Sequence, residues 1–370
     1  GGAGYGRVSV YHSLERATLP ASGSGVNFFG YHKSPIGLGN LTRGLRSALE
    51  HAGVRVQPNV IGNVAMDADL CPEDFIRTYD YSLDTNLFAS YPHLHEMLLE
   101  ALPEHVVRAR RNIVYLAWEQ RDGSPYWPEL YRDFDQVWAL SSFAAESFRR
   151  FMGREVLTVP CVLDFDALPP VATKEDLGLD PEKLTYLYVL DANSSIERKN
   201  PEGAIRAFAK AFTADEKVQL LLRISNAHRL DHRERIKQIL RAAPAHLDIR
   251  LVLEPMQHTE LLRLISAVDC YVSLHRAEGF GYTCAEAMAY GKPVIATGYS
   301  GNLEFMSPEN SFLVDHRETE VRTADGPFQR GSVWAEPDVD HAAHLMRTIC
   351  LDWGAARAVG ARGRQDVRRI

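Results

Sequence analysis

Short apolar runs alternate with longer stretches of helical periodicity along the chain from about residue 26 onwards. The short runs predict β-strands, and the stretches between them, with apolar residues three or four positions apart, predict helices. Strand and helix alternating in this way indicate a mostly parallel sheet. In the first half the predicted strands are Val26–Phe29, Val54–Gln57, Asn86–Ala89, Asn112–Leu116, Gln136–Leu140 and Val156–Val159, with helices at Leu41–His51 and His93–Leu102.

The second half repeats the alternation. In its first helix Ile205, Phe208, Ala209 and Phe212 share one apolar face, which must be buried against a sheet. Two βα halves of similar size predict an α/β protein of two doubly wound, Rossmann-like domains that face each other across a cleft. The predicted strands are Leu184–Leu190, Gln219–Ile224, Ile249–Leu253, Cys270–Leu274 and Pro293–Ala296, and the helices are Pro201–Phe212, His232–Ala242, Thr259–Ala267 and Thr283–Tyr290.

Shifts in composition suggest where the domains begin and end. The first residues are rich in Gly and Ser, and a stretch of Asp, Pro, Thr and Lys around Pro169 and Pro170 is the best linker in the sequence. The expected divisions are a leader or linker at 1–25, an N-terminal Rossmann-like domain at 26–165, a linker at 166–182, a C-terminal Rossmann-like domain at 183–352 and a C-terminal helix at 353–370. Whether this helix crosses back to the N-terminal domain stays open.

Composition and charge exclude several classes of protein. Apolar residues make up 45% of the 370 residues and charged residues 24%, which is typical of globular cores and excludes wholesale disorder. The 41 basic and 48 acidic side chains give a net charge of −7, which disfavours nucleic acid as a partner. An anionic ligand must therefore be held by a few local cations and backbone N–H groups.

The cysteines are far apart and form neither a CxxC pair nor a metal-binding spacing, which indicates a reduced, cytoplasmic chain. No apolar run is long enough to cross a bilayer, and Arg7, Glu15 and Arg16 replace the apolar core of a signal peptide. Peripheral membrane contact stays open. Because the chain starts without Met and ends in the helical run Ala361–Ile370, we expect it to be part of a longer polypeptide.

Candidate chemistry is densest in the segment HRAEGFGYTCAEAMAYGKPVIAT, which begins at His275. A predicted strand ends at Leu274, and the following loop holds Glu278 and two glycines before a helix that carries Glu286. Loops at this end of a parallel sheet open onto the ligand crevice, and carboxylates suit paired sugar or ribose hydroxyls. The alternative is a helix-capping Glu278 and a solvated Glu286.

A second candidate is DANSSIERKNPEGAIRAF, which follows the predicted strand Leu184–Leu190. Arg198 and Lys199 precede Pro201, a favourable first helical residue, so two cations stand at a helix N-terminus near the crevice. They are suited to neutralising a leaving diphosphate. A solvated turn is the alternative.

The segment EGFGYTCAEAMAYGKPVIAT resembles the E-x7-E signature of the retaining family-4 glycosyltransferases of the GT-B fold, and GYSGNLEFM is similar to the loop that follows it. The resemblance implies that Glu278 contacts hydroxyls of a donor sugar and Glu286 the ribose of its nucleotide. It also implies that backbone groups approach the donor phosphates, at Gly279, Phe280, Gly281, Tyr282 and Thr283 and at Gly301–Leu303.

The sequence departs from that family at two positions. The family carries an Arg six residues before the Lys that matches Lys199, but Asn193 stands there, so Arg198 is the candidate substitute. The family's histidine after an N-domain strand is also missing, because NIVYLAWEQ offers Trp118 and Glu119 instead. Glu119 is a candidate for binding a sugar hydroxyl or the acceptor and Trp118 for stacking on a sugar, against the alternative of a core Trp and a satisfied acid.

Two weaker candidates lie in the first half. Gly37 and Gly39 resemble the family's N-terminal glycine loop, which faces the donor, although Gly-x-Gly before a helix is often only a tight turn. His93 follows a predicted strand and is a secondary site candidate, or else an exposed histidine in the first turn of a helix.

Asp-x-Asp triplets occur at 67–69, 133–135, 164–166 and 338–340, but they are scattered and none follows a strand where a diphosphate would need a metal. We therefore expect no metal and no cofactor. The resemblance implies a hexosyltransferase that uses a nucleotide diphosphate sugar and a carbohydrate or lipid-linked acceptor with retention of configuration. The alternatives are a non-catalytic sugar-nucleotide binding module of a polysaccharide-assembly protein and a GT-B nucleotide-sugar epimerase.

Overall fold

The computed structural model describes residues 25–33, 37–61, 80–102, 106–107, 110–227, 232–322, 324 and 328–370. The chain forms two compact units. Unit 1 contains residues 1–164 together with 369–370, and unit 2 contains residues 165–368.

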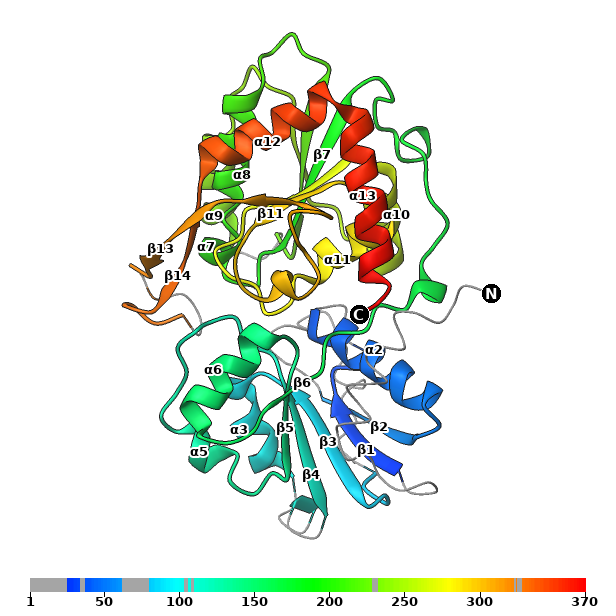
Figure 1. Ribbon diagram of the computed structural model, residues 1–370, viewed down its shortest axis with the longest axis vertical. Helices are drawn as coiled ribbons and strands as arrows, with labels where there is room; N and C mark the ends of the chain where they lie inside the picture. Colours follow the sequence, from blue (N-terminus) through cyan, green and yellow to red (C-terminus); the bar gives the residue numbers. More distant parts are fainter. Residues whose placement is uncertain are drawn as a thin grey trace. The chain divides into compact units, whose positions relative to one another are not determined.

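Unit 1 is built on a six-stranded parallel sheet (Figure 1). The strand order reverses between β1 and β3, because β2 lies on one side of β1 and the later strands lie on the other. In spatial order the strands are β2 (Arg55–Val60), β1 (Gly25–Gly30), β3 (Thr85–Ser90), β4 (Arg111–Leu116), β5 (Gln136–Ala139) and β6 (Leu157–Thr158). The helices are α2 (Gly37–His51), α3 (Pro92–Ala101), α5 (Trp127–Leu130) and α6 (Ser142–Met152).

A row of buried asparagines ties three strands of unit 1 together. Asn27, Asn86 and Asn112 occupy paired positions on β1, β3 and β4. Asn27 donates to the amide oxygen of Asn86 at 3.0 Å, and Asn86 donates to that of Asn112 at 3.0 Å. Each amide also donates to a backbone carbonyl, of Leu83, Val106 and Val107 in turn. The row therefore satisfies its buried donors and fixes the register of these strands.

Unit 2 is a second six-stranded parallel sheet. Its order reverses between β10 and β7, which is the topological switch point where doubly wound sheets bind ligands. The strands in spatial order are β12 (Phe312–Val314), β11 (Val294–Thr297), β10 (Cys270–Ser273), β7 (Leu184–Asp191), β8 (Val218–Ser225) and β9 (Ile249–Val252).

Helices cover both faces of this sheet (Figure 1). On one face lie α8 (Pro201–Ala211), α9 (Arg233–Ala242) and α12 (Val339–Leu351), which bury Ile205, Ile239 and Met346 respectively in the core. On the other face lie α10 (His258–Ala267), α11 (Tyr282–Ala289) and α13 (Trp353–Val367). Buried apolar side chains from β7, β8 and β10 complete the core. The expected α/β architecture of two doubly wound sheets is confirmed.

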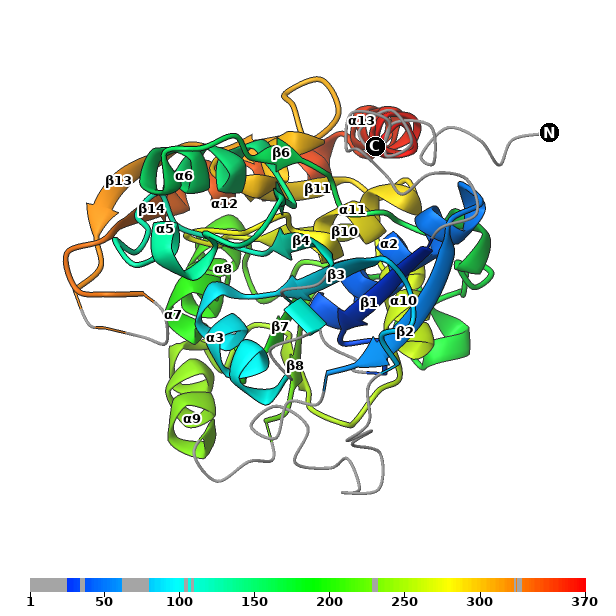
Figure 2. The same ribbon diagram turned by 90° about the horizontal axis from the view of Figure 1, so that it is seen from below.

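Some elements had no counterpart in the sequence prediction. They are α5, α6, α12, the strand β12, the short helix α7 (Ile196–Lys199) and the antiparallel hairpin of β13 (His316–Glu320) and β14 (Val333–Pro337). The hairpin projects from the side of unit 2 (Figure 2). The sequence of β13, HRETE, is wholly polar, so hydrophobic periodicity does not indicate this first strand of the hairpin. A small cluster of Val321, Phe328 and Trp334 holds it together.

Two segments expected at the domain boundary belong to unit 2. The predicted linker 166–182 runs along this unit, because Pro169 accepts a hydrogen bond from the hydroxyl of Tyr290 and Ala172 donates to Ser266. Helix α13 packs against α11, and only 369–370 group with unit 1. Among the described residues no helix is both long and apolar enough to span a membrane.

Candidate functional site

Two loops at the switch point of unit 2 bring the main candidate residues together. The loop after β7 leads through α7 to α8, and the loop after β10 leads to α11. Asn200 joins them, since its amide donates to the carbonyl of Leu274 at 2.9 Å. The backbone N–H of Arg276 also donates to the carbonyl of Arg198 at 2.7 Å. The two loops are therefore tied together at the carboxyl edge of the sheet.

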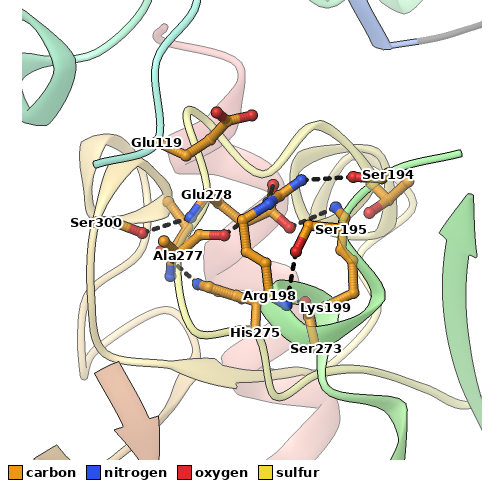
Figure 3. Close-up of polar contacts among 12 residues, drawn as sticks. Glu119, Ser194, Ser195, Arg198, Lys199, Ser273, His275, Ala277, Glu278 and Ser300 are labelled. Carbon is orange, nitrogen blue, oxygen red and sulfur yellow. Dashed lines mark hydrogen bonds and ion pairs between the residues drawn. The ribbon is translucent and has the colours of Figure 1, made fainter. Parts of the chain in front are cut away.

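Glu278 lies between the two cations that the sequence proposed for a diphosphate (Figure 3). Lys199 Nζ is 2.5 Å from Oε1 of Glu278, and a terminal nitrogen of Arg198 is 3.2 Å from Oε2. The alternative of a solvated turn is therefore wrong for Arg198, because its side chain is buried. The helix-capping alternative for Glu278 is wrong as well, because Gly281 is the N-cap residue of α11 and no side chain caps this helix. Lys199 retains 18% of its side-chain exposure and is the more accessible cation.

Arg198 is held in place by neutral groups as well as by the carboxylate. Its guanidinium donates to the carbonyl of Ala277 at 2.7 Å and to the hydroxyl of Ser194 at 2.8 Å. Lys199 is fixed through its backbone, whose carbonyl accepts from the buried hydroxyl of Tyr188. Both cations thus have a defined position before any ligand binds.

The ionisation of Glu278 follows from these neighbours. Burial alone raises the pKa of a carboxyl group, but the charges of Lys199 and Arg198 outweigh burial here and lower the pKa of Glu278 to about 2. Glu278 is therefore ionised at neutral pH. It offers carboxylate oxygens as acceptors for hydroxyl groups.

The loop after β11 fixes the backbone of Glu278. The N–H of Glu278 donates to the hydroxyl of Ser300 at 2.8 Å, and the N–H of Gly301 donates to the carbonyl of Glu278 at 2.9 Å. Gly301 has to be glycine, because a Cβ there would lie 1.8 Å from the carbonyl oxygen of Gly279. Glycine at position 301 is thus a packing requirement of the site, and the expected approach of its backbone to the donor phosphates stays a prediction.

His275 links the loop after β10 to the loop after β11. Its Nε2 lies 3.3 Å from the carbonyl of Tyr299 and 3.1 Å from the amide oxygen of Asn302. Both partners are acceptors, so this nitrogen carries the proton. Burial lowers the pKa of His275, and the imidazole is neutral at pH 7. It acts as a fixed link and contributes no charge to the site.

The start of α11 follows the loop of Glu278. Gly281, at φ +86°, occupies the N-cap position and supplies no side chain to cap the helix. Phe280 packs against Phe305 with ring centroids 4.9 Å apart, and the hydroxyl of Thr283 accepts from Tyr271 at 2.6 Å. Gly279 lies in the loop before α11, and Tyr282 is the first residue of the helix. The first turn of α11 therefore leaves backbone N–H groups for an anion.

Glu286 is buried on α11, so the solvated alternative for it is wrong. Its Oε1 lies 2.6 Å from Nε2 of His258, the first residue of α10. His258 was missed by sequence reasoning. No spacing signal links it to Glu286, because the contact depends only on how α10 packs against α11.

Asn193 occupies the position of the missing Arg. Its backbone N–H donates to Asp191 at 2.9 Å, and its amide oxygen lies 3.0 Å from Nε2 of His232. The amide Nδ2 is buried and has no hydrogen-bond partner within the described part of the chain. The position therefore holds a neutral donor in place of a cation.

The hairpin reaches the site through two arginines. The ring of Phe328 lies 5.8 Å from the guanidinium of Arg198, and the ring of Trp334 lies 5.4 Å from that of Arg276. Arg276 also forms an ion pair with Glu336 on β14 at 2.7 Å. The hairpin thus packs directly behind the cationic side of the site.

Residues 173–366, more than half of the chain, match the family of glycosyl transferases group 1. The chain belongs to this family. It is a glycosyltransferase, and the match covers the sheet, the two loops and the E-x7-E segment of unit 2.

Solved structures share the fold of this glycosyltransferase at low identity. Sucrose-phosphate synthase from Thermosynechococcus elongatus is 18% identical with a TM-score of 0.66, and 93% of this chain and 94% of that chain are covered. HepE from Anabaena is 14% identical with a TM-score of 0.64 and the same coverage. A glycosyltransferase from Rickettsia africae is 14% identical with a TM-score of 0.60, covering 98% and 88%. No curated protein matches at a significant level. The predicted GT-B fold is confirmed.

The remaining candidates of the glycosyltransferase lie in unit 1. Glu119 is buried and accepts a hydrogen bond from the hydroxyl of Tyr91 at 2.8 Å, and His93 is exposed and stacks on the ring of Tyr91. Trp118 is a core residue, because its indole N–H donates to the carbonyl of Asp122 and its ring packs edge-on against Trp127. Gly37 and Gly39 lie within the first turn of α2, which begins four residues earlier than predicted.

Members of the acidic triplets at 133–135 and 338–340 form contacts within the protein. Asp135 accepts from the backbone N–H of Asn112, Asp338 caps α12, and Asp340 forms an ion pair with Lys210. The triplet at 67–69 lies outside the described residues. Within the described ranges, no three or more His, Cys, Asp or Glu side chains are grouped to hold a metal ion.

Proposed function

We propose that this glycosyltransferase transfers a hexose from a nucleoside diphosphate sugar to a hydroxyl group of a glycan or a lipid-linked saccharide, with retention of anomeric configuration. The observation that carries the proposal is the placement of Glu278 between Lys199 and Arg198 at the switch point of unit 2. The same small site offers acceptors for sugar hydroxyls and donors for phosphates.

The structural relatives support a uridine nucleotide as the first donor to test. HepE has been solved with UDP-glucose and with UDP and glucose, and the O-GlcNAc transferase GtfA has been solved with UDP and GlcNAc. We carry this donor class over to the present chain as a hypothesis. GDP-mannose is the second donor to test.

Lys199 and Arg198 are proposed to stabilise the leaving diphosphate. The carboxylate of Glu278 balances their charge before the donor binds, which makes the buried Arg198 and the half-buried Lys199 tolerable without a ligand. Each charge-assisted hydrogen bond to a phosphate oxygen is worth about 1.5 to 3 kcal/mol. The Nδ2 group of Asn193 and the first N–H groups of α11 add neutral donors.

The proposed reaction occurs on one face of the sugar. The acceptor oxygen forms its bond to the anomeric carbon as the bond from that carbon to the phosphate oxygen breaks. The acceptor's proton passes to the departing phosphate oxygen, so no enzyme base is required. The sugar carries oxocarbenium-like charge in the transition state, and the preorganised cations favour the departure of the phosphate.

We also propose that the reaction is metal-independent, since Lys199 and Arg198 supply the positive charge for which a metal is otherwise used. Glu119 and Tyr91 of unit 1 are the candidates for contacting the acceptor. Their hydrogen bond presents a carboxylate and a phenol, both of which can pair with hydroxyl groups.

Transfer from UDP-glucose or GDP-mannose to a panel of saccharide acceptors tests the proposal, with NMR to read the anomeric configuration of the product. Removing one donor to a developing anion typically costs about 100- to 1,000-fold in rate. We therefore expect losses of that order for Lys199→Ala and Glu278→Ala, unchanged rates with EDTA, and Lys210→Ala within about twofold of the parent. Lys210 is a matched control because its ion pair with Asp340 is exposed.

Transfer rates within a few-fold of the parent in both site variants would overturn the mechanism. Nucleotide binding without turnover on any acceptor would favour a binding module. Isomerisation of the donor without an acceptor would favour an epimerase.

A further inference from the structure

The second glutamate of the E-x7-E pair is under-satisfied in the structure. The side chain of Glu286 is only 2% exposed, and its Oε1 lies 2.6 Å from Nε2 of His258. Its Oε2 is buried and has no hydrogen-bond partner among the described residues. A carboxylate accepts several hydrogen bonds, and a buried oxygen without one is costly. Glu286 is therefore poised to accept at least one more donor.

The direction of the existing hydrogen bond follows from chemistry. An ionised carboxylate only accepts, so Nε2 of His258 must carry the proton. This bond fixes the rotation of the carboxylate, with one oxygen towards His258 and the other away from it. His258 is itself 32% exposed, so it is the accessible member of the pair.

The backbone positions of the pair suit a role at the ligand crevice. His258 is the first residue of α10, which follows β9, and Glu286 lies on α11, which follows β10. Helices that follow parallel strands begin at the carboxyl edge of the sheet, which is the edge of the Glu278 loop. The start of α10 is fixed, because the N–H of Gln257 donates to the carboxylate of Glu260 at 2.7 Å.

We propose that His258 is a positioning residue for recognition of the nucleotide ribose: it holds Oε1 of Glu286 so that Oε2 is left to accept a hydrogen bond from a ribose hydroxyl. This inference rests on the proposed function, which supplies the nucleotide. It adds to the site a residue outside the E-x7-E motif, on a helix that contributes nothing to the motif's sequence. A ribose hydroxyl satisfies the acceptor atom of Glu286 that the described residues leave without a partner.

Calorimetry with UDP, GDP and their 2′-deoxy and 3′-deoxy forms tests the inference in the full chain. The parent protein should prefer the ribonucleotide to one deoxy form by about 10-fold or more, as expected for a lost hydrogen bond to a charged group. In His258→Leu this preference should fall to about threefold or less. His258→Gln, whose amide can donate in place of the imidazole, should restore most of it.

His344→Leu is the matched control, because His344 is exposed on α12, away from both loops. A thermal melt of each variant reports folding. If His258→Leu does not fold, the His258→Gln variant together with Glu286→Ala carries the test, since loss of both carboxylate oxygens must also abolish the hydroxyl preference.

The outcomes separate this inference from the proposed function. A hydroxyl preference that is unchanged in His258→Leu overturns the positioning role while leaving the proposed function intact. Equal weakening of ribo- and deoxynucleotides in that variant also overturns it, because a general structural role would act on both. No binding of any nucleoside diphosphate by the parent protein would instead overturn the proposed function.

Discussion

The hydroxyl of Ser300 accepts a hydrogen bond from the backbone N–H of Glu278 at 2.8 Å, and Ser300 makes this contact from a strained backbone conformation. Its angles, φ +76° and ψ −148°, lie in a region that is almost restricted to glycine. Such strain costs of the order of 1 to 3 kcal/mol and persists only where the surroundings enforce it. At this position the strained conformation places the hydroxyl that holds the backbone of Glu278.

Replacing Ser300 separates strain from hydrogen bonding. Ser300→Ala keeps the strained backbone and leaves the buried N–H of Glu278 without its acceptor, whereas Ser300→Gly loses the same acceptor but relieves the strain. We expect both variants to lose transfer activity and the Ala variant to be less stable than the Gly variant by about 1 kcal/mol or more. Urea unfolding measures the difference. Equal stability of the two variants would show that the backbone angle carries no strain.

The stability of the protein should depend on pH through Glu278. Its pKa in the folded protein is about 2, below the ordinary value of 4.5, so its stabilising contribution is complete above about pH 4.5 and is lost as pH falls towards 2. Glu278→Gln leaves Lys199 and Arg198 without their counter-charge, which should destabilise the protein by about 3 to 5 kcal/mol at pH 7. The gap between parent and variant should shrink below pH 4.5. Urea midpoints from pH 7 to pH 2.5 measure this gap, and a constant gap would contradict the ion-pair interpretation.

Phe328 should act on the donor site through Arg198. Phe328→Leu keeps apolar volume in the cluster of the hairpin but removes the ring that faces the guanidinium. A desolvated cation–π contact is worth up to about 2 kcal/mol, so we expect KM for the donor to rise about 3- to 10-fold. Phe165→Leu is the control, because its ring lies 5.3 Å from Arg368, an arginine with no contact to Glu278. A similar KM in both variants would remove the hairpin from the donor site.

Asn86 is the central member of the asparagine row in unit 1. Asn86→Leu removes the donor to Asn112 and to the carbonyl of Val106 and leaves these buried acceptors without a partner. At about 1 to 3 kcal/mol for each orphaned group, we expect a loss of at least 2 kcal/mol in the unfolding of unit 1. The fluorescence of Trp118, Trp127 and Trp138 follows that transition. A change in the free energy of unfolding below about 0.5 kcal/mol, which is the usual range for surface substitutions, would contradict a structural role for the row.

Periodicity and local motifs determined much of the architecture. Buried strands such as Leu184–Asp191 are continuous apolar runs, and helices such as Pro201–Ala211 show one apolar face, so both are legible without a structure. The hairpin of β13 and β14 was not, because both strands are short, β13 is polar, and the hairpin is stabilised by a cluster of three side chains. The local pattern of apolar and polar residues does not predict such packing.

The sequence by itself determined which residues stand at the carboxyl ends of β7 and β10, because strand ends and the turns after them are local properties. It therefore identified Glu278, Lys199, Arg198 and Glu286. Only the tertiary structure decided their partners. Glu278 and Lys199 are 79 positions apart and His258 and Glu286 are 28 apart, and contacts over such separations depend on strand order and helix packing. The tertiary structure also buries both carboxylates. A carboxylate that has lost its water must be held by neighbouring donors, so burial fixes Glu278 and Glu286 against their partners.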